Sequence, residues 1–250
     1  MPRFFVKTEQ IEETKISIIG EDVKHIKNVL RKRTGDIIEI CNQETGIAYK
    51  CEIQEIGEEV ISNNILQEIT TTDGRIKIDI YQGLPKADKM ELIIQKSIEL
   101  GVNAVIPVEM QRCIVKLDSK SENKKIERWK KIAESAAKQS GRNTIPEIRH
   151  IAKIEDIINS KNEYDAIIVC YENEKQNTIK NELLKIKQLS LEKSHIKLAI
   201  VIGPEGGLEE NDVENLKNNG AKIVTLGNRI LRTETVALNI LSVIMYELEC

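Results

Sequence analysis

Short stretches of apolar and polar residues alternate over the first part of the chain. Ile37–Cys41 and Ala48–Ile53 are rich in residues that favour β-strands, and the polar segment Asn42–Gly46 between them is typical of a hairpin loop. We expect a further strand to open near Glu58–Ile61 and one helix near Asp22–Arg31. Short strands separated by turns predict a compact β-barrel.

The pattern changes after the polar turn at Thr70–Gly74, where we place a domain boundary. The predicted domains are residues 1–72 and 73–250. Beyond the turn, strand-like apolar runs alternate with helical patterns, which predicts an α/β domain with a parallel sheet. The predicted strands are Ile76–Tyr81, Ala104–Val108, Ala166–Cys170, Lys197–Ile202 and Lys222–Leu226, and the predicted helices are Asp88–Leu100, Ile126–Ser140 and Thr233–Glu247.

Ligands of such sheets bind beyond the carboxyl ends of the strands, so the segments that follow the strands are the place to seek a site. These segments are Gln82–Lys89, Gln111–Lys116, Tyr171–Glu172, Gly203–Gly207 and Gly227–Thr233.

The segment Gly203–Gly207 contains three glycines and lies between a predicted strand and a helix that begins near Glu209. Glycines let a backbone approach a ligand closely, and the N–H groups at a helix start favour polar or anionic partners. The alternative is an ordinary tight turn. Neither the dinucleotide motif G-x-G-x-x-G nor the P-loop motif occurs in the chain.

The loop before the final helix contains Arg229 and Arg232 among apolar residues. We predict Thr233 as the N-cap of that helix, and Glu234 suits the helix dipole in the first turn. The two arginines either serve a ligand or pair with Glu205 or Glu234.

The final helix is apolar on nearly all sides, which is typical of a helix buried on more than one face. One face can pack on the sheet and another on a second subunit in a two-fold dimer. The alternative is a core helix within one chain. The apolar residues are Val236, Ala237, Leu238, Ile240, Leu241, Val243, Ile244 and Met245.

Charge and composition narrow the class of protein. The formal net charge is −3, yet the segment from Lys24 to Arg33 holds five lysines and arginines and no acid. This basic run suits a phosphate contact, and the alternative is a solvated helix face. The five cysteines form no C-x-x-C pair and the three histidines lie far apart, so we expect no metal site. We expect no membrane span and no signal peptide, and hence a cytoplasmic protein.

Two motifs in the C-terminal part carry a family resemblance. Gly203–Gly207, followed by Leu226-Gly227 and by Arg229–Thr235, resembles the signature of the SPOUT methyltransferases, and more narrowly that of the 16S ribosomal RNA (uracil-N3)-methyltransferase family. The sequence departs from the family at Asn228, where proline is frequent, and at Val236, where alanine is usual. Neither departure removes a polar group.

The resemblance extends over nearly the whole chain. The opening of the chain resembles the PUA-like RNA-binding domain of that family, and the middle matches further family segments. The first group is Met1–Phe5, His25, Val29–Arg31 and Gly35-Asp36, and the second is Lys89–Glu91, Gln95-Lys96, Glu99–Gly101, Arg112-Cys113 and Gln139–Arg142.

The resemblance implies an α/β fold in which a SPOUT-type parallel sheet with a C-terminal trefoil knot follows a small PUA-like β-barrel. Knots are rare exceptions to the rules of chain topology. The implied cofactor is S-adenosyl-L-methionine, and the implied assembly is a homodimer. The residues expected to bind the cofactor are Tyr171, Ile202, Gly203, Pro204, Glu205, Gly206, Leu226, Gly227, Ile230, Leu231 and Thr233.

The implied reaction is methylation of N3 of a uridine in 16S rRNA, within the small ribosomal subunit. Uracil N3 carries a proton, so the site needs a proton acceptor or cations that stabilise the uracilate charge. Arg232 and Arg142 are candidates for the cationic role, and Glu234 or Glu205 for the proton acceptor. The alternative for the two glutamates is structural, with Glu234 as a helix-dipole partner and Glu205 fastening the loop.

Basic residues in both domains are candidates for contacts with RNA phosphates, which predicts a steep loss of RNA affinity with added salt. They are Arg3, Arg31, Arg33, Lys86, Lys89, Arg112 and Lys116.

Three other functions compete with this interpretation. A SPOUT enzyme that methylates the ribose 2′-OH of rRNA or tRNA is the first. A ribosome-assembly protein that binds RNA without catalysis is the second. A general nucleotide-binding α/β protein is the third, and the missing phosphate-binding motifs disfavour it.

Overall fold

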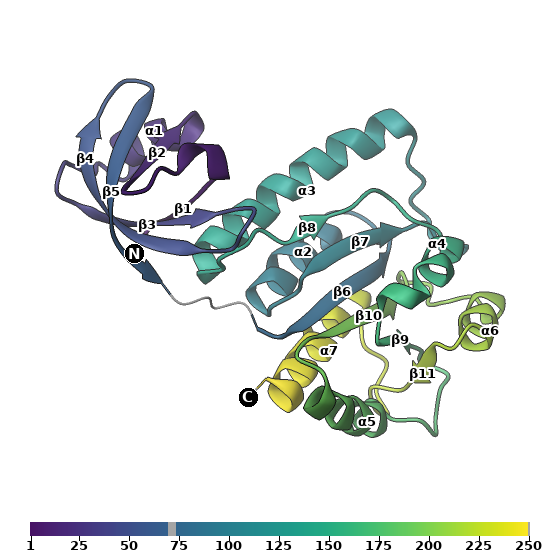
Figure 1. The fold of residues 1–250 in the computed structure, drawn as a ribbon. Coiled ribbons are helices and arrows are strands. Elements are labelled where there is room, and N and C mark those ends of the chain that lie inside the picture. Colours follow the sequence, from purple (N-terminus) through teal and green to yellow (C-terminus); the bar gives the residue numbers. More distant parts are fainter. Residues whose placement is uncertain (70–73, 250) are drawn as a thin grey trace. The chain divides into compact units, whose positions relative to one another are not determined.

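The computed structural model describes residues 1–69 and 74–249 (Figure 1). Most of the predicted boundary at 70–74 lies outside these residues, and the division into domains 1–72 and 73–250 stays a prediction. Of the described residues, 1–69 and 137–145 form one compact unit, here the first unit. Residues 74–136 and 146–249 form the second unit.

The first unit is built on a curled, five-stranded half-barrel sheet with the order β1-β3-β4-β5-β2 (Figure 1). β1 runs parallel to β3, and the other neighbours are antiparallel. The predicted hairpin at Ile37–Cys41 and Ala48–Ile53 is confirmed as β3 and β4. The elements are β1 Arg3–Val6, the 3-10 helix η1 Thr8–Gln10, β2 Lys15–Ile19, β3 Ile37–Asn42, β4 Ala48–Ile56 and β5 Val60–Ile69.

The core of the first unit follows the period of two that a half-buried strand requires. Ile16 and Ile18 on β2, and Ile38 and Ile40 on β3, alternate with more exposed residues and are buried together with Phe4. The alternation therefore fixes which face of each strand points into this unit.

The helix predicted near Asp22–Arg31 is confirmed, although it is shorter and of mixed type. It consists of α1 Glu21–Lys24 and a π-helical turn, η2 His25–Val29, in which the Leu30 N–H donates to the His25 carbonyl over 2.9 Å. Arg31 follows with a φ of 50°, a left-handed conformation that ends the helix.

The second unit contains a six-stranded sheet with the order β11-β9-β10-β6-β7-β8, and all of its strands are parallel. The predicted α/β fold with a parallel sheet is therefore confirmed. The two-residue strand β8 is too short for the sequence pattern to indicate. The strands are β6 Ile76–Gly83, β7 Ala104–Val108, β8 Glu147–Ile148, β9 Ala166–Cys170, β10 Ile196–Ile202 and β11 Lys222–Val224.

Helices lie on both faces of this sheet (Figure 1). α7 contacts β6 and β10 and also α2 and α5, so these three helices form one layer, while α4 packs with α6. The trefoil knot itself stays a prediction. The helices are α2 Lys89–Glu99, α3 Ser119–Ser140, α4 Ile154–Asn159, the 3-10 helix η3 Lys161–Glu163, α5 Ile179–Glu192, α6 Glu210–Asn218 and α7 Thr233–Leu248, and residues 137–140 of α3 belong to the first unit.

Helix α3 begins earlier than the apolar pattern predicts. The expected start was Ile126, whereas the helix begins at Ser119 because Asp118 accepts a hydrogen bond from the Ser121 N–H over 2.8 Å. The backbone N–H and the hydroxyl of Ser121 lower the pKa of Asp118, as expected for a carboxylate at a helix start. Its first turns are polar, so they leave no apolar period in the sequence.

Helix α7 buries one face within the second unit and leaves another open. The buried residues recur at intervals of three and four, as expected for one face of a helix. Thr235, Asn239, Ser242 and Tyr246 are exposed on the opposite face. The buried face consists of Thr233, Ala237, Ile240, Leu241, Ile244 and Leu248.

No helix among the described residues has the length and apolar character needed to span a bilayer.

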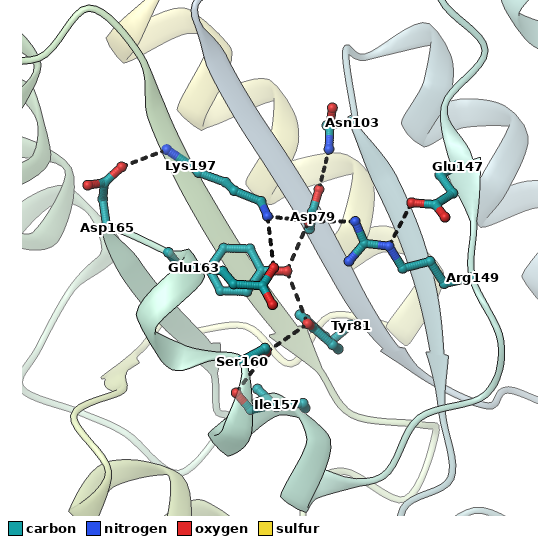
Figure 2. Close-up of polar contacts among 11 residues, drawn as sticks. Asp79, Tyr81, Asn103, Glu147, Arg149, Ile157, Ser160, Glu163, Asp165 and Lys197 are labelled. Carbon is teal, nitrogen blue, oxygen red and sulfur yellow. Dashed lines mark hydrogen bonds and ion pairs between the residues drawn. The ribbon is translucent and has the colours of Figure 1, made fainter. Parts of the chain in front are cut away.

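A buried carboxylate in the middle of β6 links several strands of the second unit (Figure 2). Asp79 is fully buried and accepts hydrogen bonds from the Tyr164 hydroxyl over 2.9 Å and from Asn103 Nδ2 over 2.6 Å. Arg149 and Lys197 lie 3.6 and 3.8 Å from the same carboxylate. Burial and the neighbouring hydroxyl and carboxylate raise the pKa of Tyr164, so it stays a donor. This network holds β6 against β10 and β7.

Candidate functional site

A cavity of about 460 Å³ lies at the carboxyl ends of β9, β10 and β11, where a parallel sheet is expected to bind ligands. It is lined by the segments that follow these strands and by the first turn of α7. Lys89, at the start of α2, completes the wall. The lining residues are Lys89, Cys170–Glu172, Lys175, Ile202–Gly207, Thr225–Thr233 and Val236.

The glycine loop, residues Gly203–Gly207, is tightly packed. A Cβ atom on Gly203 would lie 2.9 Å from the Gly207 carbonyl carbon, and Gly207 has a φ of 73°. The Gly207 N–H closes the turn onto the Pro204 carbonyl over 2.9 Å. The loop is the tight turn that the sequence allowed as an alternative to a ligand site, and it also forms one wall of the cavity.

The arginine loop, residues Thr225–Arg232, is open by comparison. Ile230 is 86% exposed, and the backbone N–H groups of Ile230 and Leu231 donate to no described residue. Arg229 and Arg232 are exposed and line the cavity. Neither arginine forms an ion pair within the described part of the chain, so the alternative that they pair with Glu205 or Glu234 is wrong.

The two glutamates pair with Lys89 instead. Lys89 Nζ lies 2.9 Å from Glu205 Oε1 and 3.5 Å from Glu234 Oε2. Glu205 also accepts the Lys86 N–H over 3.0 Å, so it fastens the glycine loop to the segment after β6. Burial alone would raise the pKa of Glu205, but the hydrogen bonds from Lys89 and Lys86 outweigh it and hold this pKa below its ordinary value. Glu205 is therefore ionised and a weak proton acceptor.

The prediction that Thr233 is the N-cap of α7 is wrong. The cap position is Arg232, and Thr233 is the first helical residue. The Thr233 hydroxyl donates to the Gly203 carbonyl over 2.7 Å and accepts from Gln82 Nε2 over 2.8 Å. A long-range partner thus replaces the local backbone partner that a cap would have.

Arg112 holds the far end of the glycine loop. Its Nε atom lies 2.6 Å from Glu209 Oε2, and its Nη1 atom donates to the Gly206 carbonyl over 3.1 Å. Arg112 was expected to bind RNA phosphates. The structure gives its guanidinium internal partners instead.

All residues predicted to bind the cofactor line the cavity. Of the predicted catalytic residues, Arg232 lines the cavity, and Glu234 forms an ion pair with Lys89, which also lines it. Arg142 is half-buried in the first unit. Gln82, the partner of Thr233, was not among the predicted site residues. The lining residues Lys175, Thr225, Asn228 and Val236 were not predicted to bind the cofactor either.

The other cations expected to bind RNA fall into two groups. Arg31, Arg33, Lys86 and Lys116 are exposed. Arg3 is 8% exposed, and its guanidinium binds Glu39 at 2.8 Å, Asn143 Oδ1 at 2.8 Å and the Gly141 carbonyl. Burial removes this side chain from phosphate, so the expectation for Arg3 is corrected: it holds the first unit together.

Matches to family models define the class of protein. The model of an RNA methyltransferase domain matches residues 72–245, and the model of an RNA methyltransferase PUA domain matches residues 18–61. The parallel sheet and its strand-end cavity lie within the first match, and the curled sheet overlaps the second. The fold and the site are thus those of an RNA methyltransferase.

Individual relatives narrow this class. Ribosomal RNA small subunit methyltransferase E of Bacillus subtilis (strain 168) is 42% identical over 256 residues, which cover 100% of this chain and 98% of that protein. The enzyme of the same name from Buchnera aphidicola subsp. Schizaphis graminum (strain Sg) is 32% identical, with 95% and 93% covered. A crystal structure of the Neisseria gonorrhoeae enzyme of that name, bound to S-adenosyl methionine, has a TM-score of 0.79, 29% identity and 98% and 97% covered. The chain belongs to the family of ribosomal RNA small subunit methyltransferases E.

Proposed function

We propose that this chain transfers a methyl group from S-adenosyl-L-methionine to N3 of one uridine in 16S rRNA, in the cytoplasm. The observation that carries the proposal is the cavity at the strand ends of a chain of this family, with Arg232, which forms no ion pair among the described residues, in its wall. The crystallised gonococcal relative holds the same cofactor. The target uridine is an unpaired base or one that has left its stack, because N3 is hidden in a base pair.

The cavity suits this cofactor in size and in chemistry. Its volume of about 460 Å³ is within the range of small-molecule sites. The open backbone N–H groups of Ile230 and Leu231 suit the polar edge of an adenine ring. Leu226 and Ile202 offer apolar surface, and Gly203 leaves room for close approach. The other proposed contacts come from Tyr171, Pro204, Glu205, Gly206, Gly227 and Thr233.

Arg232 is the proposed catalytic cation. When bound, S-adenosylmethionine supplies a methyl group on a positively charged sulfur. Loss of the N3 proton leaves negative charge on O2 and O4 of uracil, and the exposed Arg232 guanidinium can stabilise it. Arg142, which belongs to the first unit, is the second proposed cation.

The proton on N3 leaves to water or to Glu234 in this proposal. Glu205 is the weaker candidate, because its ion pair with Lys89 and its bond to Lys86 lower its pKa. The Lys89 ion pairs also show that both glutamates have structural partners. Orientation and the Arg232 charge therefore supply most of the catalysis.

RNA binding is assigned to exposed cations of both units. Arg31 and Arg33 follow the π-helical turn of the first unit, and Lys86 and Lys116 follow β6 and β7 in the second. Lys89 and Arg112, which already have internal partners, contribute further positive charge to the second unit. We also propose a homodimer, because half-buried Val236, Leu238 and Val243 border the open face of α7.

The test is incubation of the purified protein with radiolabelled S-adenosylmethionine and small ribosomal subunits that lack the modification. Nucleoside analysis is expected to recover the label as 3-methyluridine. Label on a ribose would keep the cofactor and replace the uracil target. Binding of the cofactor without any transfer to RNA would instead support the non-catalytic RNA-binding protein. Subunits that already carry the modification are the matched control and are expected to accept no label.

A further inference from the structure

Gln82 stands at the end of β6, next to the cavity but outside its lining. The side chain is fully buried. Its Nε2 atom donates to Thr233 Oγ1 over 2.8 Å and to the Gly83 carbonyl over 3.0 Å, and it lies 3.5 Å from the Gly203 carbonyl. Three acceptors therefore surround one amide nitrogen.

The surroundings of this amide select the donor group. Two of the three neighbours are carbonyl oxygens, which cannot donate, so only the NH₂ end of Gln82 fits there. The other end, Oε1, is buried and has no hydrogen-bond partner among the described residues. An unpartnered buried acceptor is unfavourable. The Gln82 amide therefore makes hydrogen bonds with its nitrogen while its oxygen makes none among the described residues.

Thr233 passes the hydrogen bond on. Its hydroxyl accepts from Gln82 and donates to the Gly203 carbonyl over 2.7 Å. Thr233 directly follows the arginine loop, and Gly203 opens the glycine loop, so the chain of hydrogen bonds joins both walls of the cavity. Such chains polarise and strengthen each bond in a buried setting.

The backbone beside Gln82 is in close contact with the same wall. A Cβ atom on Gly83 would lie 2.6 Å from both the nitrogen and Cδ of Pro204. β6 itself is paired with β10 and β7 on its two sides, and the Asp79 network ties it to both (Figure 2). The end of β6 is thus a firm base for the cavity.

We propose that Gln82 is a positioning residue for the cofactor. Through Thr233 and the Gly203 carbonyl it sets the spacing of the glycine loop and the arginine loop before the cofactor enters. This inference rests on the proposed binding of S-adenosylmethionine. A pocket formed in advance binds more tightly, because binding does not have to order its walls.

The test compares variants by calorimetric titration with S-adenosylmethionine and by thermal unfolding without it. Gln82→Met keeps the length of the side chain and removes both donors, and Thr233→Val removes the hydroxyl. Each is expected to weaken cofactor binding about tenfold. Gln82→Glu is expected to weaken it more, because an oxygen replaces the nitrogen that faces two carbonyls. Thr233→Ser keeps the hydroxyl and is expected to bind more tightly than Thr233→Val.

The double variant Gln82→Met with Thr233→Val separates positioning from general loss of packing. If the two residues act through the same chain of hydrogen bonds, the double variant binds the cofactor no worse than the weaker-binding single variant. If they act independently, the two losses of binding free energy would add. Ser97→Ala is the matched control, since Ser97 is fully buried in α2 and its hydroxyl has no hydrogen-bond partner among the described residues. Its cofactor affinity is expected to be unchanged.

Two outcomes would overturn the inference. One is a folded Gln82→Met variant whose affinity lies within about twofold of the unmodified protein. The other is a double variant whose losses simply add. An unmodified protein that does not bind S-adenosylmethionine would contradict the proposed function instead, which keeps the two failures distinct.

Discussion

The two loops that line the cavity are held in different ways. The glycine loop is fixed from several sides: Thr233 binds its first carbonyl, Glu205 binds Lys89, and Arg112 binds the Gly206 carbonyl. The arginine loop has few such partners, and Ile230 projects from it with 86% of its surface exposed. One wall is thus preformed, whereas the other leaves backbone donors and charged side chains open to a ligand.

The fixed glycine loop and the open arginine loop therefore suit different tasks. A fixed wall can select the cofactor by fit, because its atoms cannot move to admit another shape. An open wall with exposed arginines can respond to RNA as it arrives and can place charge where the reaction needs it. The substitutions below test this division, from the largest expected effect to the smallest.

Gly203→Ala is expected to abolish measurable cofactor binding. Its Cβ atom would lie 2.9 Å from the Gly207 carbonyl carbon and 3.0 Å from the Leu208 nitrogen, and a fixed backbone cannot yield. In Gly206→Ala the nearest atoms to the new Cβ would be the Arg112 Cβ at 3.2 Å and the Arg112 carbonyl oxygen at 3.4 Å, so calorimetry should show a much smaller loss. Equal losses in the two variants would show that the loop is not held as rigidly as its contacts indicate.

Arg232→Ala is expected to lower turnover on ribosomal subunits about 100-fold, because a charge that stabilises the uracilate would be lost. The affinity for S-adenosylmethionine should change little, since Arg232 is exposed and has no ion pair among the described residues. Single-turnover rates at saturating cofactor measure the effect. Arg229→Ala, a change at another exposed position of the same loop, is the control and should lower turnover less. Full turnover by Arg232→Ala would contradict its catalytic role.

Glu205→Gln is expected to lower the melting temperature at pH 7 by about 2–4 °C. The folded-state pKa of Glu205 lies below the ordinary value of 4.5, because bonds from Lys89 and Lys86 outweigh the effect of burial. Its ionised form therefore contributes stability above pH 4.5, and this stability is lost as the pH falls through the lowered pKa. Melting curves of the two proteins should converge at acid pH. A constant difference across the range would mean that charge is not involved.

Lys116→Ala is expected to reduce the salt dependence of RNA affinity by about one counterion, which is the smallest effect of the set. Lys116 is exposed, whereas Arg112 on the same segment binds Glu209 and the Gly206 carbonyl. Arg112→Ala should therefore weaken the binding of S-adenosylmethionine and leave the salt dependence of RNA affinity nearly unchanged. Filter-binding titrations at several salt concentrations distinguish the two. The reverse result would place Arg112 among the open cations.

Much of the fold could be predicted because the apolar pattern is local. The strands at Ala104–Val108 and Ala166–Cys170 stand where continuous apolar runs predict them. The hairpin of β3 and β4 follows from alternation around a polar turn. The start of α3 at Ser119 could not be found this way, because its first turns are solvated and carry no apolar period.

The segments of the site were also visible in the sequence, since ligand-binding residues of a parallel sheet follow its strands. All predicted cofactor residues line one cavity. Their individual partners were not visible. Thr233 looked like a cap because threonine often caps a helix, and Arg3 looked like a phosphate ligand because arginine is usually exposed.

The sequence by itself therefore determined the strands, the two motif loops and the resemblance to an RNA methyltransferase family. Only the tertiary structure decided which groups meet: Gln82 with Thr233, Lys89 with Glu205, and Arg3 with Glu39. Periodicity depends on neighbours within one element, so a single chain segment carries it. Hydrogen bonds and ion pairs between distant residues depend on how segments pack, and no local pattern records that.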